Sequence, residues 1–231
     1  MKVLVLFIAM VCAIACTTTE TILDFNLVEG SINKLDSAYV IFQEQAYRFP
    51  LDAQGKGTLK MNIKEDGFAI LVYGKLSTNI YLKQGNTLKV IWDKEDWRGG
   101  KMQVVSDDGG INEYIRLNIE KSFKKATECS FTLEEDSFMD KVEQTIRELS
   151  AGIDSTNFAP EIKDILKASS KYEVLYWIYK YPRFHNFGKR MSQEEYLAFK
   201  RFNEYMFDKF EAHPEYLCLT AYREYAVNWF Y

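Results

Sequence analysis

Histidine and cysteine, the side chains that most often bind metals or act as nucleophiles, are scarce in this sequence. Only two histidines, His185 and His213, occur among 231 residues. His185 lies among aromatic residues, and His213 precedes a proline. A zinc site needs several ligands at short spacing, and these two histidines do not provide it. The sequence therefore argues against a metal centre, and we expect both histidines to be ordinary surface or capping residues.

The four cysteines include no Cys-x-x-Cys pair, so the sequence lacks the usual redox-active dithiol motif. Cys12 and Cys16 lie in the N-terminal stretch, which leaves Cys129 and Cys218. A nucleophilic Cys218 would need a histidine beside it, and nothing in the spacing requires His213 to face the thiol. Two buried free thiols are the preferred interpretation of Cys129 and Cys218. A disulfide between them is the alternative, because the sequence does not show whether they are close.

The chain has no excess of positive charge, which argues against a nucleic-acid partner. Lysine and arginine number 29 and aspartate and glutamate 33, for a formal charge of −4. Without Lys2 the balance is 28 against 33, or −5. Hydrophobic residues make up 47% of the chain and aromatic residues 15%, which is ample for a packed core and argues against disorder.

Short motifs that could indicate a phosphate or carboxylate site have simpler structural interpretations. Gly109-Gly110 lacks the lysine and the spacing of a phosphate-binding loop. Glu134-Glu135-Asp136 stands where a helix is expected to begin, and acidic residues there stabilise the positive end of the helix dipole. Asp107-Asp108 fits a loop leading into a helix. No catalytic residue, metal ligand or cofactor-binding residue is therefore predicted.

The first residues form the clearest functional signal in the chain. Lys2 is followed by an apolar run from Val3 to Ala15, and the polar residues Thr17 to Glu20 end it. A transmembrane helix needs about 20 apolar residues, so this run is too short to span a bilayer. The positive residue, the apolar run and the small residues after it are typical of a secretory signal peptide. We therefore predict a removed signal over residues 1–15.

The residues Ala13-Ile14-Ala15-Cys16 resemble the lipobox of bacterial lipoproteins, although leucine is usual where Ala13 stands. In that family the cysteine becomes the mature N-terminus and its thiol carries a diacylglyceryl group. Each buried methylene contributes about 0.8 kcal/mol, so two or three acyl chains hold a protein on a membrane durably. The resemblance implies lipidation at Cys16 and a periplasm-facing membrane lipoprotein; ordinary secretory cleavage after Ala15 is the alternative.

Residues 16–100 carry the pattern of an antiparallel β-sandwich. Apolar residues alternate with polar ones around Phe25 and again around Met61, and turn residues separate short strands with no helix between them. Phe68 to Tyr73 is nearly all apolar, as in a central strand. Gln84-Gly85-Asn86 separates two short apolar runs, Ile80 to Leu82 and Leu88 to Trp92, and predicts a hairpin.

Residues 101–231 carry helical signals, and a bundle of about five helices is expected there. The apolar period of 3.6 starts at Ile111. Thr132 to Glu135 and Ser192 to Glu195 both have the spacing of a capping box. Pro160 suits the first turn of a helix. Four further boundaries are expected: a stop at Gly152, an end at Pro182, a break at His213-Pro214, and a last helix from Glu215 to Tyr231.

Several loose motifs together are similar to one family. They are Gly30, Asp52-x-x-Gly55, Tyr81-Leu82-x-x-Gly85, Gly110-x-Asn112-x-Tyr114 and Tyr181-Pro182-Arg183-Phe184-His185. The chain resembles the N-terminal region of TlpA-type thiol–disulfide oxidoreductases of Bacteroidetes. The resemblance implies a lipoprotein with a β-sandwich, then a helical region, then a thioredoxin domain. Because the sequence holds no Cys-x-x-Cys, no catalytic residue of that family carries over to it.

Two functions are compatible with these observations. The first is a lipid-anchored periplasmic binding or interaction module with no catalytic activity of its own, whose partner is an unknown envelope protein or peptide. The second is the anchoring and positioning half of a thioredoxin-like reductase whose catalytic domain is missing from this chain. The aromatic residues from Tyr172 to Phe187 and from Tyr196 to Phe210 fit core packing between helices, with a ligand groove as the alternative.

Overall fold

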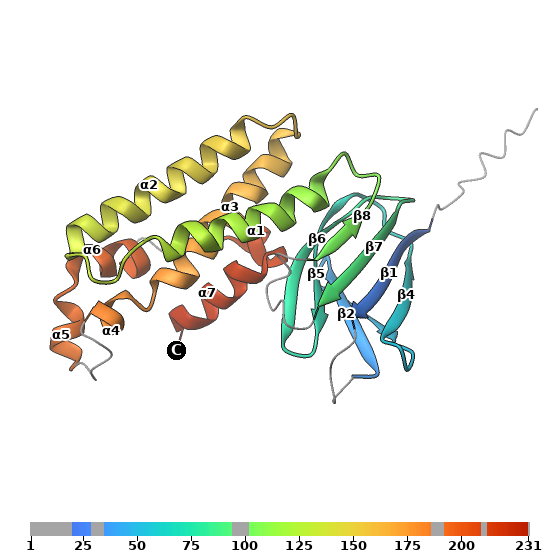
Figure 1. Ribbon diagram of the computed structural model, residues 1–231, viewed down its shortest axis with the longest axis horizontal. Helices are drawn as coiled ribbons and strands as arrows, with labels where there is room; N and C mark the ends of the chain where they lie inside the picture. Colours follow the sequence, from blue (N-terminus) through green and yellow to red (C-terminus); the bar gives the residue numbers. More distant parts are fainter. Residues whose placement is uncertain (1–19, 29–34, 94–101, 186–191, 209–211, 231) are drawn as a thin grey trace, which may run out of the picture.

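Eight strands in the described part of the chain form two four-stranded sheets that pack face to face (Figure 1). The computed structural model describes residues 20–28, 35–93, 102–185, 192–208 and 212–230, so the export stretch and Cys16 lie outside them. One sheet has the order β4-β1-β7-β8 and the other β3-β2-β5-β6. The strands are β1 Thr21–Val28, β2 Ser37–Phe42, β3 Gln45–Pro50, β4 Lys56–Met61, β5 Gly67–Tyr73, β6 Leu76–Leu82, β7 Thr87–Asp93 and β8 Gln103–Val105.

The alternation in the sequence places one side of each sheet in a shared core. Phe25 of β1 is 2% exposed, and its ring lies 6.0 Å from that of Phe49 in the other sheet. On its own sheet it contacts Trp92 edge to face, at 6.4 Å between ring centroids. Such facing aromatic and aliphatic side chains are what hold two sheets together in a sandwich. The predicted α+β class, with a β-sandwich first, is confirmed.

Two features of the pairing differ from the antiparallel pattern expected. β1 and β7 run parallel, with Leu23 opposite Leu88. The predicted hairpin at Gln84-Gly85-Asn86 is wrong, because β6 and β7 belong to different sheets. The turn is instead bound to β1: Gly85 N–H donates to Thr21 Oγ1 at 3.0 Å, and Ile22 N–H donates to the Asn86 carbonyl at 2.9 Å. Turn residues predict a chain reversal but not the strand that will pair beyond it.

The helical part follows β8 and lies beside β5 and β6 (Figure 1). None of its described helices is long and apolar enough to cross a bilayer. Its core includes Phe138 stacked on Tyr181, with ring centroids 3.8 Å apart. The helices are α1 Ile111–Thr127, α2 Glu135–Asp154, α3 Pro160–Ile178, α4 Tyr181–His185, α5 Gln193–Leu197, α6 Lys200–Asn203 and α7 Thr220–Phe230, with a π-helical turn at Glu204–Asp208 and a 3₁₀ turn at Pro214–Cys218.

Of the three helix starts predicted from a proline or a capping box, two are confirmed and one is wrong. Pro160 occupies the first turn of α3. At α5 the Ser192 hydroxyl accepts from Glu195 N–H, and the Glu195 carboxylate accepts from Ser192 N–H, which is the predicted capping box. At α2 the predicted box does not form, because the Thr132 hydroxyl bonds Ser130 and the helix begins only at Glu135.

The predicted helix ends and the predicted last helix also shift. α2 continues through Gly152 to Asp154, and α3 ends at Ile178 rather than at Pro182, which lies within α4. Pro214 begins a 3₁₀ turn, so the last helix starts at Thr220 and not at Glu215. Proline is well tolerated in the first turn of a helix, where its missing N–H costs nothing, so it marks a start as readily as a stop.

A side-chain amide joins the sandwich to the first helix. Asn112 of α1 accepts a hydrogen bond from Tyr81 N–H at 2.8 Å and donates one to the Tyr81 carbonyl at 2.7 Å. It therefore pairs the free edge of β6 as a neighbouring strand would. Asp108 holds this amide in place, because its carboxylate accepts from the Asn112 side chain and from Ile111 N–H at 3.0 Å.

A second amide on the same strand joins the sandwich to the last helix. Asn79 Nδ2 donates to the Cys218 carbonyl at 2.7 Å, and Thr220 N–H donates to Asn79 Oδ1 at 3.3 Å. An apolar cluster also joins β6 to the helices, and its buried members are Tyr81, Ile111, Ile115, Ile119, Ile153 and Leu166. The two halves of the chain therefore share one buried joint along β6.

We expect Asn112→Ala to lower the free energy of unfolding by about 2–3 kcal/mol, because it leaves the Tyr81 N–H and carbonyl unpaired in a buried place. The measurement is urea denaturation followed by circular dichroism. The matched control is Asn62→Ala, at an exposed position, which should change the free energy of unfolding by less than about 0.5 kcal/mol. Equal effects at the two positions would contradict the role given to Asn112.

Candidate functional site

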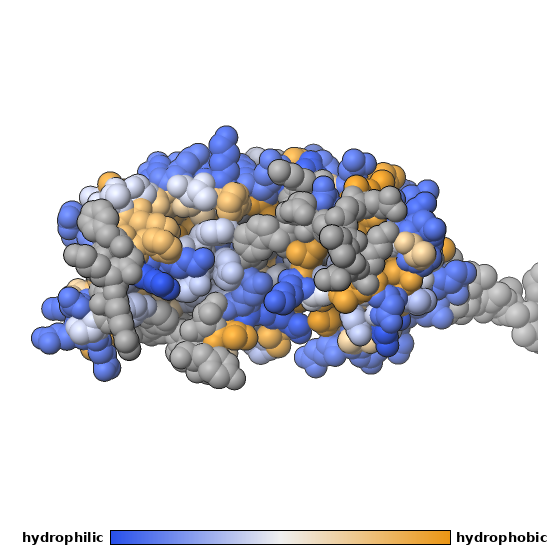
Figure 2. Space-filling model, turned by 60° about the horizontal axis from the view of Figure 1, so that its bottom comes forward, coloured by the Kyte–Doolittle hydropathy of each residue, from blue (hydrophilic) through white to orange (hydrophobic). Residues whose placement is uncertain are grey.

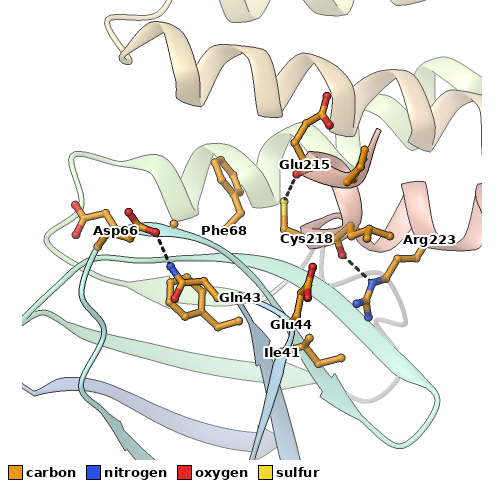
Figure 3. Close-up of a pocket in the computed structure, with 13 residues that line it drawn as sticks. Ile41, Gln43, Glu44, Asp66, Phe68, Glu215, Cys218 and Arg223 are labelled. Atoms are coloured by element: carbon orange, nitrogen blue, oxygen red, sulfur yellow. Dashed lines mark hydrogen bonds between the residues drawn. The ribbon is translucent and has the colours of Figure 1, made fainter. Parts of the chain in front are cut away.

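A pocket of about 280 Å³ opens where the sandwich meets the last helical segment (Figure 3). We call it the junction pocket. Three separate stretches of chain build it: the β2–β3 turn, the turn before β5, and the segment from Pro214 into α7. Its lining residues are Ile41, Phe42, Gln43, Glu44, Glu65, Asp66, Gly67, Phe68, Pro214, Glu215, Leu217, Cys218 and Arg223.

The β2–β3 turn that forms one lip of the junction pocket has an unusual backbone. Gln43 and Glu44 have φ angles of 48° and 63°, in the left-handed region that glycine and asparagine normally occupy in such two-residue turns. Each such residue costs on the order of 1 kcal/mol or more. The Gln43 side chain is held by a 2.7 Å hydrogen bond to Glu65. The fold therefore keeps this lip in one position in spite of its backbone strain.

Charge in the junction pocket is predominantly negative. The described residues that line it include one cation, Arg223, and four acidic residues: Glu44, Glu65, Asp66 and Glu215. The Arg223 Nε–H donates to the Leu217 carbonyl at 2.7 Å. Among the described residues, no carboxylate lies within ion-pair distance of the Arg223 guanidinium. The lining therefore has a formal excess of three negative charges, counting four carboxylates against one guanidinium.

Three of these four carboxylates already accept hydrogen bonds from other groups of the protein. Asp66 Oδ1 accepts from Gln84 N–H at 2.7 Å, and Glu65 accepts from Gln43. Hydrogen bonds from its own backbone N–H and from His213 lower the pKa of Glu215, which further favours its ionised form. Each of these groups keeps further lone pairs for a ligand.

The thiol of Cys218 lies at the wall of the junction pocket but is not activated. Its Sγ donates to the Glu215 carbonyl at 3.4 Å, and burial raises its pKa to about 11. Burial also raises the pKa of Cys129, which is 2% exposed in the helical core. Because the thiolate is the reactive form, both groups are poor nucleophiles at neutral pH. Both are free, with Cys129 buried and Cys218 half-buried, so the predicted alternative, a disulfide between them, is wrong.

The two histidines lie apart from any cluster of metal-binding side chains. His213 Nδ1 lies 2.9 Å from Glu215 Oε1, and His185 Nδ1 lies 3.1 Å from the Phe131 carbonyl. Within the described ranges, no three or more His, Cys, Asp or Glu side chains gather at metal-binding distance. His213 therefore pairs with a carboxylate and does not activate the neighbouring Cys218.

The acidic and aromatic motifs of the helical half have structural roles in the described part of the chain. Glu135 accepts from Phe202 N–H at 2.8 Å, and Asp136 pairs with Arg201 at 3.5 Å. Asp108 caps α1, as a loop leading into a helix would. Tyr172, Tyr181 and Phe202 of the two aromatic stretches are buried in the helical core, whereas Tyr176, Trp177 and Tyr179 are half-buried at its surface.

A second cavity of about 330 Å³ lies on the other side of the segment that holds His213 and Glu215. Its lining residues are Ile146, Ser150, Asp164, Lys167, Ala168, Lys171, Tyr172, His213 and Tyr216. The 3₁₀ turn thus separates the two cavities, with Tyr216 lining one and Glu215 and Cys218 lining the other. Unlike the junction pocket, this cavity is bounded by helices α2 and α3 and by no strand among the described residues.

The sequence did not indicate the junction pocket. Glu44, Asp66 and Arg223 come from stretches far apart in the chain, and each is an unremarkable surface residue in its own stretch. Only the turn chemistry at Glu65-Asp66-Gly67 and the break at His213-Pro214 mark two of its borders. The lip at Gln43-Glu44 has no glycine or asparagine to mark it as a turn.

No protein-family model, no curated protein and no solved structure matches this chain. The resemblance to TlpA-type oxidoreductases therefore stays a prediction. Any function given to the chain rests on its own residues and on how the fold brings them together.

We expect Cys218 to react with iodoacetamide at pH 8 roughly a hundredfold more slowly than a thiol of ordinary pKa, because its pKa is raised to about 11 and the thiolate fraction falls accordingly. The rate should keep rising with pH up to that value. Mass spectrometry of tryptic peptides follows the alkylation, with glutathione as the reference thiol. Alkylation of Cys218 at pH 7 as fast as that of glutathione would contradict this assignment.

Proposed function

We propose that this chain is a lipid-anchored module of the cell envelope that faces the periplasm and binds a protein or peptide partner without catalysing a reaction. The observation that carries the proposal is the junction pocket, which the sandwich and the last helical segment build together. Binding sites in proteins are commonly concave, partly apolar and lined by a few fixed polar groups, and they often lie between structural units. The junction pocket has each of these properties.

The rigidity of the joint supports a binding role. Asn79 bonds the strand β6 to the segment that carries Cys218, so one pocket wall is attached to the sheet that supplies the other. Glu65 bonds Gln43, which links the two sheet-derived lips of the junction pocket. A pocket held in this way binds without a large cost for ordering its own side chains.

The chemistry of the lining supports binding more than bond making. The Cys218 thiol is protonated at neutral pH and hydrogen-bonded to a carbonyl. Three of the four carboxylates already accept hydrogen bonds from neighbouring residues. Covalent catalysis by Cys218 would need a base beside the thiol, and the described lining offers no such pair.

The short distance between the proposed anchor and the fold supports a position close to the membrane. Only four residues, Thr17 to Glu20, separate Cys16 from the first strand at Thr21. Fully extended, they reach about 14 Å, so the sandwich would stay within that distance of the lipid surface. A partner is then expected to be another envelope protein or a peptide at the same surface.

The surface favours a partner that binds in the junction pocket over one that binds a broad apolar face of the molecule. Figure 2 shows hydrophilic and hydrophobic residues interspersed on one side of the molecule, with the hydrophobic ones in several separate patches. The apolar side chains with the highest exposed fractions among the described residues are scattered over different elements, for example Val105 on β8, Leu197 on α5 and Val227 on α7. Single exposed apolar residues of this kind are normal on protein surfaces.

The lipid anchor predicts the mass of the mature protein. When the full chain is expressed in a Gram-negative host, intact-mass spectrometry of the membrane fraction should show a chain that begins at Cys16 and carries two or three acyl groups. Cys16→Ala should lose the acyl mass and leave the membrane fraction, and Cys218→Ala should keep both. A mature chain that begins at Cys16 without acyl mass would show secretion without an anchor.

The binding site can be tested in cells by placing a photo-crosslinking amino acid at Leu217, which lines the junction pocket and is 38% exposed. We expect a discrete crosslinked adduct that the same substitution at Leu117 on α1 does not give, although Leu117 is 47% exposed. Adducts are identified by mass spectrometry. If both positions give the same adducts, or Leu217 gives none, the junction pocket is not a binding site.

A further inference from the structure

On the premise that the junction pocket binds a partner, we propose that it receives the lysine or arginine side chain of an extended peptide segment. The pocket combines three properties that suit this ligand: acidic lining residues, apolar lining residues and a size near that of one long side chain. The ligand is therefore defined by a cationic head on an aliphatic stem.

Acidic residues of the lining provide the negative charge. Glu44 stands on the strained β2–β3 turn and makes no hydrogen bond or ion pair within the described part of the fold. In Figure 3 it rises from the turn toward the wall that carries Cys218 and Arg223. Glu65 and Asp66 line the same pocket from the turn before β5. The Glu215 carboxylate instead points away from Glu44 in Figure 3 and lies 2.9 Å from His213 Nδ1. Carboxylates that line a partly closed cleft concentrate the field on a cation that enters it.

The apolar residues of the lining provide the apolar contact. Ile41, Phe68 and Leu217 line the junction pocket from three different stretches of chain. Lysine and arginine bury their methylene stems against such surfaces while the charged head stays near polar groups. A lining that holds both apolar and acidic side chains therefore matches a long cationic side chain better than it matches a small hydrophilic cation.

The volume restricts the size of the ligand. At about 280 Å³ the junction pocket lies just below the range of about 300–1,000 Å³ that drug-sized ligands and cofactors fill. One side chain with its flanking backbone fits this space. Arg223 on the α7 side binds the Leu217 carbonyl through Nε, so its terminal nitrogens are placed to donate to a peptide carbonyl.

The arrangement of the carboxylates favours an organic cation over a metal ion. Ca²⁺ and Mg²⁺ need several oxygens that converge within about 2.6 Å of one point. Within the described residues no three acidic side chains gather in this way. The carboxylates that line the junction pocket are instead spread over separate stretches of chain. This spacing suits an ammonium or guanidinium group, which has several hydrogen-bond donors.

The test uses the full lipidated protein in detergent micelles and three acetylated, amidated peptides: Ala-Ala-Lys-Ala-Ala and its analogues with norleucine or glutamate at the centre. Amide NMR shifts of residues 41–44, 65–68 and 215–218 report binding. We expect the lysine peptide to shift these signals and to bind at least about threefold more tightly than the norleucine peptide. Raising the salt concentration should weaken its binding, because screening acts on the charge pair.

The matched variants are Glu44→Gln and Glu161→Gln. Both remove one charge from an exposed glutamate, but Glu161 lies at the start of α3, outside the junction pocket. Glu44→Gln should weaken binding of the lysine peptide about two- to fivefold and leave binding of the norleucine peptide unchanged. Glu161→Gln should alter neither.

Three results would overturn the inference. The first is equal binding of the lysine and norleucine peptides, and the second is tighter binding of the glutamate peptide. The third is the absence of pocket shifts with any peptide, or shifts that only added Ca²⁺ produces. In each case the crosslinking experiment at Leu217 decides separately whether the junction pocket binds a partner of another chemistry.

Discussion

The two hydrogen bonds between the Asn112 side chain and the backbone of Tyr81 decide how this molecule is assembled. A free sheet edge is a liability, because its N–H and carbonyl groups can pair with another chain. Here a helix presents an amide that closes the edge of β6, and Asp108 orients that amide while capping the same helix. One small polar network therefore pairs the edge of a sheet, caps the start of a helix and joins the two.

The position of the junction pocket depends on this joint. Because β6 also binds the last helix through Asn79, the segment from Pro214 to Cys218 is placed above the β2–β3 turn. That turn holds two residues in the left-handed region without glycine, a strain that the surrounding contacts must offset. Strain of this kind is often kept where a side chain has to point in a particular direction, and here it directs Glu44 at the opening.

The same burial that stabilises the joint also determines its chemistry. It raises the pKa of Cys218, so the one thiol at the junction pocket stays protonated, while the pKa of the exposed Glu215 is lowered by its hydrogen bonds. A cavity with a protonated thiol and ionised carboxylates is suited to recognition. A tether at Cys16 would hold that cavity beside a membrane, where a partner is met by motion in two dimensions.

Local sequence patterns were sufficient for the class of fold and for much of its local structure. The alternation around Phe25 predicted the inward face of β1, and the capping box at Ser192 and the proline at 160 predicted the starts of two helices, because these signals act between residues a few positions apart. The parallel pairing of β1 with β7, the separation of β6 and β7 into different sheets, and the junction pocket were decided by tertiary structure alone. Each depends on contacts between residues such as Thr21 and Gly85 or Asn79 and Cys218, whose distance in space no local pattern encodes.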